Sequence, residues 1–511
     1  MLTRALSRFG APLGFALGLA LVACGDDDDD SPSSAGSAGQ GLGGSAGSAG
    51  EGAGAGRGGA AGAGAAGAGA AGAGGDILAR LGATPGLTVN EVPSDQPGQR
   101  WFVLSLRQPL DHDDAAAGTF EQRLVLAHRD ESAPLELGTQ GYAYGSDNPG
   151  ETELTRAFGA NLLRVEHRFF NASKPAGAEL PWGLLDTRQA ASDLHRVVEA
   201  LKPIYAGPWF SEGVSKGGMT ALYHRRAFPD DVVATVAYVA PNSLGTDDQR
   251  YPVFLAAVGD EACRQRIVDV QRAALARRGE ILPLLEASLG AEGYGFSVLG
   301  SSNLAFEHAV QEFRYAFWQY GGPADCDTLP DPAGAAAPLA DALRDVMTGF
   351  SDFILDYYAP YYYQAATELG QYGPLEQGLE DLITFPGTYR VESYPPLGVP
   401  KVFRPESMPA VASWLSTEAT RVLLIYGTLD PWTAGAFDPG ASTSVRRFDA
   451  NGGNHGTKIV SLSEPDRAAA LGLLETWLGL KAVQPQALLG TPAREKAPLP
   501  WQRRWLIEGP L

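Results

Sequence analysis

The stretch Gly213-Val214-Ser215-Lys216-Gly217 follows a short apolar segment and precedes a run of helical character at residues 217–228. This G-x-S-x-G pattern is typical of a sharp turn between a strand and a helix, which exposes the hydroxyl group of its serine. Glycine at both ends leaves room for the backbone and for an approaching carbonyl group. Because roughly one chain of this length in six would contain the pattern by chance, Ser215 is interpreted together with its possible partners.

Two residues that could activate Ser215 come later in the chain. Asp430 follows the apolar segment 421–426, and His455 lies in the glycine-rich loop 452–456, after the next extended segment. A carboxylate at the first position can orient an imidazole, which can then act as general base and as general acid. The order Ser, Asp, His is that of the α/β-hydrolases. A plain Asp-Pro turn at Asp430 and a structural role for His455 are the alternatives.

Strands and helices are predicted to alternate around these residues, and the first two extended segments form an antiparallel start to the sheet. In addition to the strand before Ser215, extended segments are predicted at residues 100–110, 120–128, 135–137, 162–167, 232–240, 421–426 and 445–448. Between residues 244 and 416 the alternation gives way to helical, aromatic sequence. We therefore predict an α/β-hydrolase fold with a large, mainly helical cap inserted between the sixth and seventh strands.

The domain boundaries follow from this organisation. Residues 76–243 and 417–511 are expected to form the α/β-hydrolase domain, and residues 244–416 the cap. Cys263 and Cys326 both fall in the cap, where an oxidising compartment would allow a disulfide; two buried free thiols are the alternative. The chain has no CxxC, HExxH or His/Cys cluster, so we predict neither a metal nor a cofactor.

The N-terminus indicates export. Arg4 and Arg8 precede an apolar run at residues 11–23 that is too short to span a bilayer stably. Leu21-Val-Ala-Cys24 resembles a bacterial lipobox, which implies that residues 1–23 are a signal peptide and that Cys24 carries the lipid. An ordinary signal peptide is the alternative. By analogy with Gram-negative sorting, the glycine after Cys24 favours the outer membrane, so we expect a lipid-anchored protein of the cell envelope whose core is exported.

Residues 24–75 are predicted to be a tether. Five aspartates follow the lipidated cysteine and its glycine, and the rest of the segment is almost wholly Gly, Ala and Ser. Such a composition cannot bury enough apolar surface to fold. The formal net charge of −20 and the absence of a basic stripe argue against nucleic-acid binding.

Acyl-transfer chemistry at Ser215 also requires an oxyanion hole. The backbone N–H of Lys216, directly after the nucleophile, is one expected donor. The second is expected from the glycine-rich loop at residues 138–145, with Gly141 or Tyr142 as the choice. The side chain of Lys216 is expected to be simply solvated.

Several segments resemble the secreted prolyl tri/tetrapeptidyl aminopeptidases of actinobacteria, which are related to the prolyl carboxypeptidase and dipeptidyl peptidase group. The resemblance covers residues 99–480, with Val214 where a glycine is expected, and it rests on Gln108-Pro-Leu-Asp-His112, Gly118-Thr-Phe-Glu-Gln-Arg123, Glu166-His-Arg-Phe-Phe170, Ser215-Lys-Gly-Gly-Met-Thr220 and Gly453-Asn-His455. It implies cleavage after proline near the N-terminus of a peptide, through an acyl-enzyme on Ser215, with Asp430 and His455 completing the triad. An esterase or lipase on the same fold and a non-catalytic, surface-binding lipoprotein are the alternatives.

An aminopeptidase must also hold the ammonium group of its substrate, usually with a carboxylate. The possible anchors are Glu151, Glu153, Glu166 and Glu212; for each, a surface or structural charge is the alternative. Aromatic residues of the predicted cap could line a slot for the proline ring or form the cap's own core. The sequence does not indicate an oligomeric state.

Overall fold

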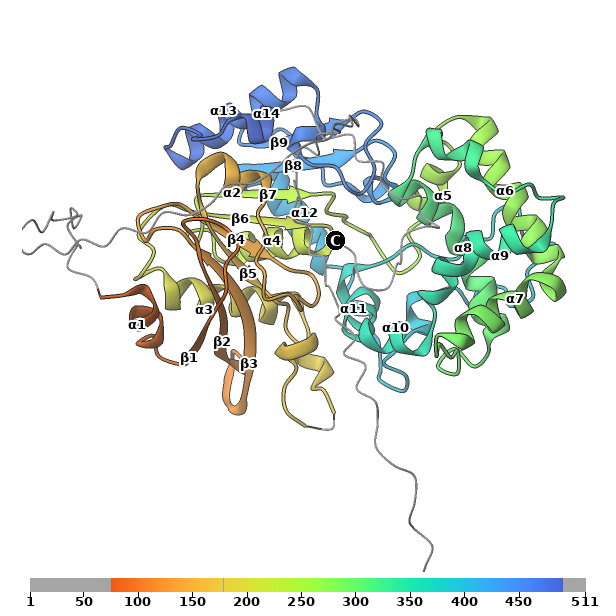
Figure 1. The fold of residues 1–511 in the computed structure, drawn as a ribbon, viewed down its shortest axis with the longest axis horizontal. Coiled ribbons are helices and arrows are strands. Elements are labelled where there is room, and N and C mark those ends of the chain that lie inside the picture. Colours follow the sequence, from red (N-terminus) through yellow and green to blue (C-terminus); the bar gives the residue numbers. More distant parts are fainter. Residues whose placement is uncertain (1–74, 178, 490–511) are drawn as a thin grey trace, which may run out of the picture.

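The computed structural model describes residues 75–177 and 179–489, so the predicted signal peptide, Cys24 and the tether up to residue 74 lie outside the described residues. One sheet of nine strands forms the centre of the fold, in the order β1-β2-β3-β5-β4-β6-β7-β8-β9 (Figure 1). Pairing is antiparallel from β1 to β5 and parallel from β5 to β9. The strands are β1 (Leu87–Val92), β2 (Arg100–Asp111), β3 (Asp114–His128), β4 (Leu135–Thr139), β5 (Asn161–Val165), β6 (Trp209–Val214), β7 (Ala234–Tyr238), β8 (Val422–Gly427) and β9 (Val445–Ala450).

This strand order, with the nucleophile turn directly after β6, is that of an α/β-hydrolase, and it confirms the predicted fold. The antiparallel start of the sheet is confirmed by the pairing of β2 with β3. One strand was not predicted, because β1 lies at the sheet edge and its residues are mostly polar or partly exposed. With β1 counted, the helical segment lies between the seventh and eighth strands rather than between the sixth and seventh.

Helices cover both faces of the sheet (Figure 1). One face is covered by α3 (Thr187–Leu201), α4 (Lys216–Ala227) and α12 (Ser407–Thr417), and the other by α2 (Glu153–Phe158), α13 (Glu464–Leu478) and α14 (Gln486–Leu489). The short α1 (Ile77–Gly82) packs beside β1. The parallel strands β4, β7 and β8 are buried along their whole length, as expected for strands covered on both faces. α12 packs on α4 although it lies within the range predicted for the cap.

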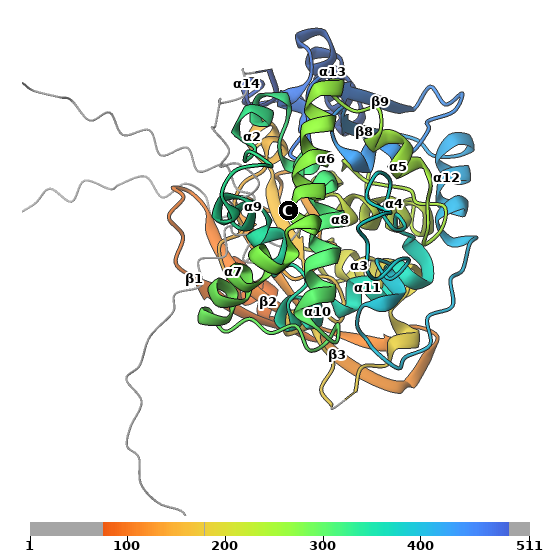
Figure 2. The same ribbon diagram turned by 90° about the vertical axis from the view of Figure 1, so that its right-hand side faces the viewer.

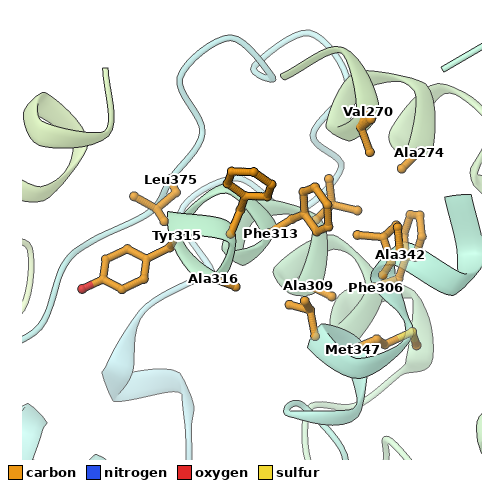
Figure 3. Packing of buried hydrophobic residues seen from close by; sticks show 14 of the residues in the cluster. Val270, Ala274, Phe306, Ala309, Phe313, Tyr315, Ala316, Ala342, Met347 and Leu375 are labelled. Atoms are coloured by element: carbon orange, nitrogen blue, oxygen red, sulfur yellow. The ribbon is translucent and has the colours of Figure 1, made fainter. Parts of the chain in front are cut away.

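A group of helices between β7 and β8 forms a separate lobe, here called the helical insertion, which stands in front of the sheet in the view of Figure 2. It has its own apolar core, in which residues of α6, α8 and α9 interdigitate (Figure 3). None of the described helices is long and apolar enough to cross a membrane. The helices are α5 (Arg250–Leu255), α6 (Glu261–Ala276), α7 (Arg278–Ala291), α8 (Ser302–Tyr320), α9 (Ala336–Thr348), α10 (Asp352–Tyr357) and α11 (Ala359–Gln364).

The structure joins Cys263 of α6 to Cys326 of the short helix η3 (Pro323–Thr328) in a disulfide that closes a loop of 63 residues. A crosslink over such a loop restricts the unfolded chain, and we expect the variant with Cys263→Ser and Cys326→Ser to lose about 2–4 kcal/mol of unfolding free energy. Thermal unfolding of both proteins, each with and without a reducing agent, tests this. Reductant should lower the melting temperature of the wild type alone; equal melting temperatures for all four samples would contradict it.

Candidate active site

Ser215 occupies a strained turn between β6 and α4. Its φ of 56° lies in the left-handed region, although it is not a glycine, and such strain is typical of a nucleophile turn. Its N–H donates to the carbonyl oxygen of Tyr238 at 2.8 Å, which fixes the turn to β7. A Cβ atom on Gly213 would lie 2.2 Å from the carbonyl oxygen of Gly217. The predicted need for glycine on both sides of the turn therefore has a direct steric reason.

Asp430 and His455 form a buried pair. The Nδ1 atom of His455 lies 2.7 Å from Oδ2 of Asp430, and both side chains are buried. The other oxygen, Oδ1, accepts from the N–H of Trp432 at 3.1 Å and caps the helix η6 (Pro431–Gly435). Asp430 therefore both begins the Asp-Pro turn and pairs with His455, as the predicted triad requires. The pairing fixes the ring so that Nε2 is free to exchange a proton.

Ser215, Asp430 and His455 follow the carboxyl ends of β6, β8 and β9, which meet at one edge of the sheet. Among the described residues, Nε2 of His455 has no hydrogen-bond partner. It is the atom that must accept the proton of Ser215, and this contact commonly forms only when substrate is bound. The structure thus joins Asp430 to His455 directly and leaves the acceptor nitrogen open.

The end of α8 holds the loop that carries His455. The backbone N–H of His455 donates to the carbonyl oxygen of Gln319 at 2.9 Å, and Nδ2 of Asn454 donates to that of Tyr320 at 2.9 Å. The predicted base, His455, is therefore positioned by the helical insertion as well as by the sheet.

The structure brings the loop of Gly141 and Tyr142, one of the predicted sources of an oxyanion hole, against Lys216. A Cβ atom on Gly141 would lie 2.6 Å from Cβ of Lys216 and 2.8 Å from the backbone nitrogen of Gly217, so the loop packs directly on the N-terminus of α4. In the described part of the chain, the N–H groups of Gly141, Tyr142 and Lys216 donate to no protein acceptor. Unpaired N–H groups gathered beside a nucleophile can stabilise a developing oxyanion.

The side chain of Lys216 is not solvated, contrary to expectation. It is buried, and its Nζ donates to the carbonyl oxygen of Gly141 at 2.6 Å. Nζ also lies 5.5 Å from the ring centre of Tyr142 and 5.7 Å from that of Phe170. Burial holds the pKa of Lys216 well below its usual range, and the charge of Glu368 offsets only part of this. Lys216 therefore ties the loop of the oxyanion hole to the residue after the nucleophile.

Two of the four predicted amine anchors bind other parts of the chain. Glu151 accepts from Nε2 of Gln99 at 2.8 Å and forms an ion pair with Arg129. Glu153 is buried and accepts from the hydroxyl group of Tyr238 at 2.7 Å. It also accepts from two consecutive backbone N–H groups, at residues 459 and 460. Both carboxylates therefore already have protein partners.

The other two predicted anchors are buried as well. Glu166 accepts from the N–H of Tyr144 at 2.7 Å and from both the N–H and the hydroxyl group of Ser173. Glu212 is buried, and this burial raises the pKa of its carboxyl group. Glu151, Glu153 and Glu166 thus have protein partners, and Glu212 lies buried in the sheet.

Two further side chains near the predicted triad, which the sequence does not single out, lie in and beside the insertion. Trp432 stands 6.4 Å, ring to ring, from His455, and could have been suspected from its place two residues after Asp430. Glu312 of α8 is partly exposed among tyrosines, and nothing in its helical, aromatic surroundings singled it out. Among the described residues, no group of three or more His, Cys, Asp or Glu side chains could hold a metal ion.

Comparisons with known proteins agree with the resemblance carried by the motifs. Residues 70–498 match the family PS-10 peptidase S37. The chain is 40% identical over 419 residues to the prolyl tri/tetrapeptidyl aminopeptidase of Streptomyces mobaraensis, covering 81% of this chain and 86% of the relative. It is 28% identical to the lysosomal Pro-X carboxypeptidase of Mus musculus, covering 32% of this chain and 37% of the relative. The proline iminopeptidase structure from Mycobacterium smegmatis aligns at 14% identity and a TM-score of 0.35, covering 73% and 99% of the two chains.

Replacing Lys216 by methionine should impair the oxyanion hole without emptying the space around it. Methionine fills the same space with an apolar side chain, but it leaves the carbonyl group of Gly141 without its hydrogen-bond donor. A buried polar group without a hydrogen-bond partner is costly. We therefore expect kcat to fall about 10- to 100-fold, with little change in KM. Lys202→Met, on an exposed residue after α3, is the control. Steady-state kinetics and thermal unfolding of both variants test this, and an unchanged kcat in a folded Lys216→Met protein would contradict it.

Proposed function

The chain belongs to the PS-10 peptidase S37 family and is a serine peptidase, and we propose that it releases short peptides, of three or four residues, from the N-terminus of peptides by cleavage after proline. Its substrates are then peptides with proline near the N-terminus. The name of the Streptomyces relative and the contacts around the triad support this proposal.

The observation that carries the proposal is the set of aromatic rings around the triad. Tyr320 and Trp432 lie 6.2 and 6.4 Å from the ring of His455. On the side of the oxyanion hole, Tyr358 and Tyr361 lie 5.6 and 5.5 Å from Tyr142. Tyr320, Trp432, Tyr358 and Tyr361 all remain partly exposed. Proline presents a compact apolar ring without an N–H group, which aromatic surfaces bind without leaving a polar group unpaired.

In the proposed reaction, Oγ of Ser215 attacks the carbonyl carbon of the proline residue while Nε2 of His455 takes the hydroxyl proton. The negative charge on the carbonyl oxygen is stabilised by the N–H groups at Lys216 and at Gly141 or Tyr142. The C–N bond then breaks, and His455 returns the proton to the departing amine. Water, activated by His455, hydrolyses the ester on Ser215 and restores the enzyme.

Matched chromogenic substrates test the proposal. We expect the purified core, residues 76–511, to cleave Ala-Ala-Pro-p-nitroanilide rapidly and its succinylated form far more slowly. Replacing proline by alanine should lower kcat/KM by at least about 10-fold, because the compact ring then no longer fills its slot. A fluorophosphonate should label the protein and fail to label the Ser215→Ala variant, which serves as the control.

Each alternative gives a different result in the same experiment. Turnover of p-nitrophenyl esters without cleavage of prolyl amides would identify an esterase or lipase with the same triad. Failure of the fluorophosphonate to label the folded wild type would favour a non-catalytic, surface-binding lipoprotein. Either result would overturn the proposed specificity.

We also propose that the protein is held at the bacterial outer membrane by a lipid on Cys24, with its core exported from the cytoplasm. The proposal is supported by the sequence Leu21-Val-Ala-Cys24 and by the Gly/Ala/Ser-rich segment after it. The full-length protein should partition into the detergent phase of a Triton X-114 extract, and the Cys24→Ala variant should not. Recovery of both proteins in the aqueous phase would contradict the anchor.

A further inference from the structure

Glu312, near the middle of α8, presents a carboxylate to a group of tyrosines. It accepts hydrogen bonds from the hydroxyl groups of Tyr372, at 2.9 Å, and Tyr389. The two hydroxyl groups lie 3.3 Å from each other. The Glu312 side chain keeps partial contact with solvent, and yet burial raises its pKa to about 7. The carboxylate of Glu312 is thus poorly hydrated.

No cationic side chain among the described residues lies within ion-pair distance of Glu312. Other buried carboxylates of the helical insertion do have cations: Glu307 pairs with Arg278 at 2.5 Å, and Glu368 with Arg404 at 2.8 Å. A poorly hydrated carboxylate without a cation is costly, so it favours either a proton or a positively charged ligand. The hydroxyl groups of Tyr372 and Tyr389 donate hydrogen bonds to Glu312, but they supply no positive charge to balance it.

A continuous set of aromatic contacts links Glu312 to the catalytic base. Tyr372 stacks on Tyr315 with ring centres 4.1 Å apart, and the two rings lie 5.6 and 5.3 Å from Trp432. Trp432 in turn lies 6.4 Å from His455. In Figure 3, the Tyr315 hydroxyl group points away from the other labelled residues of the insertion core. The hydroxyl of Tyr315 and Nε1 of Trp432 have no partner within the described chain.

We propose that Glu312 binds the α-ammonium group of the peptide substrate and thereby sets how many residues are removed. This inference rests on the proposed function. An ammonium group would supply the charge that Glu312 lacks, and the neighbouring rings offer further attraction for a cation. Three to four residues of extended peptide reach about 10–13 Å, so the separation of Glu312 from Ser215 would fix the number of residues removed. In the proposed binding mode, a peptide with its N-terminus at Glu312 places its third or fourth residue at Ser215.

The test compares Glu312→Gln with the wild type on Ala-Ala-Pro-p-nitroanilide and on its N-acetylated form. Glutamine keeps the shape and the hydrogen bonds but removes the charge. We expect kcat/KM for the free peptide to fall about 10- to 100-fold, and that for the acetylated peptide to stay within about twofold of the wild type. Glu286→Gln, on an exposed residue of α7, is the matched control and should behave as the wild type on both substrates.

A second variant separates charge from folding. Glu312→Asp keeps the carboxylate but moves it back by one methylene, so we expect it to recover part of the activity on free peptides and to shift the preference within a series from Ala-Pro to Ala-Ala-Ala-Ala-Pro. Equal losses on free and acetylated peptides would show a structural role and overturn the proposal, as would no loss on either. If the wild type itself cleaves no peptide after proline, the proposed function fails, and the inference with it.

The pH dependence provides an independent readout. The ratio of kcat/KM for the free peptide to that for the acetylated peptide cancels the titration of His455. This ratio should rise as the pH increases through about 7, where Glu312 loses its proton, and fall near pH 8, where the substrate amine loses its own. Tyr315, Tyr361, Tyr362, Tyr372, Tyr389 and Tyr394 surround the carboxylate, and burial raises their pKa values, so they stay neutral. A ratio independent of pH in the wild type would overturn the proposal.

Discussion

The last turn of α8 ends in carbonyl groups that no amide of the helix can satisfy, and the loop of His455 supplies their donors. Gln319 and Tyr320 accept from the backbone of His455 and from the side chain of Asn454. This arrangement makes the catalytic base depend on the helical insertion, whereas the nucleophile depends on the sheet. The insertion cannot move away from the sheet at this point without releasing two hydrogen bonds and the base with them.

The other side of the same junction is apolar. Trp432, whose backbone N–H fixes the orientation of Asp430, packs its ring against Tyr251, Tyr315 and Tyr372 of the insertion. The carboxylate that orients His455 is therefore held by Trp432, whose ring in turn packs on aromatic residues of the insertion. Polar contacts on one side and ring contacts on the other join the two parts of the fold at the predicted triad, and they bring aromatic side chains of the insertion close to His455.

The sheet and the triad could be predicted from the sequence because their signals are local. Apolar strands followed by Ser215, Asp430 and His455 appear as short, contiguous patterns, and the structure places all of them at one edge of the sheet. Lys216 and Glu312 could not be predicted because their environments come from distant segments. The carbonyl group that Lys216 binds lies in another loop, at Gly141, and the tyrosines around Glu312 follow it by 60 and 77 residues. Only packing shows that Lys216 is buried and that Glu312 lies among tyrosines.

Lys216 and Glu312 carry opposite charges when they are ionised, and burial favours the neutral form of each side chain. Burial lowers the pKa of Lys216 and raises that of Glu312 to about 7. Nζ of Lys216 donates to the carbonyl oxygen of Gly141 and so supports the loop beside the nucleophile turn. Glu312 gains its full negative charge most readily when a cation arrives to stabilise it. In the proposed binding mode, the substrate's ammonium group thus stabilises the charged form of the residue that binds it.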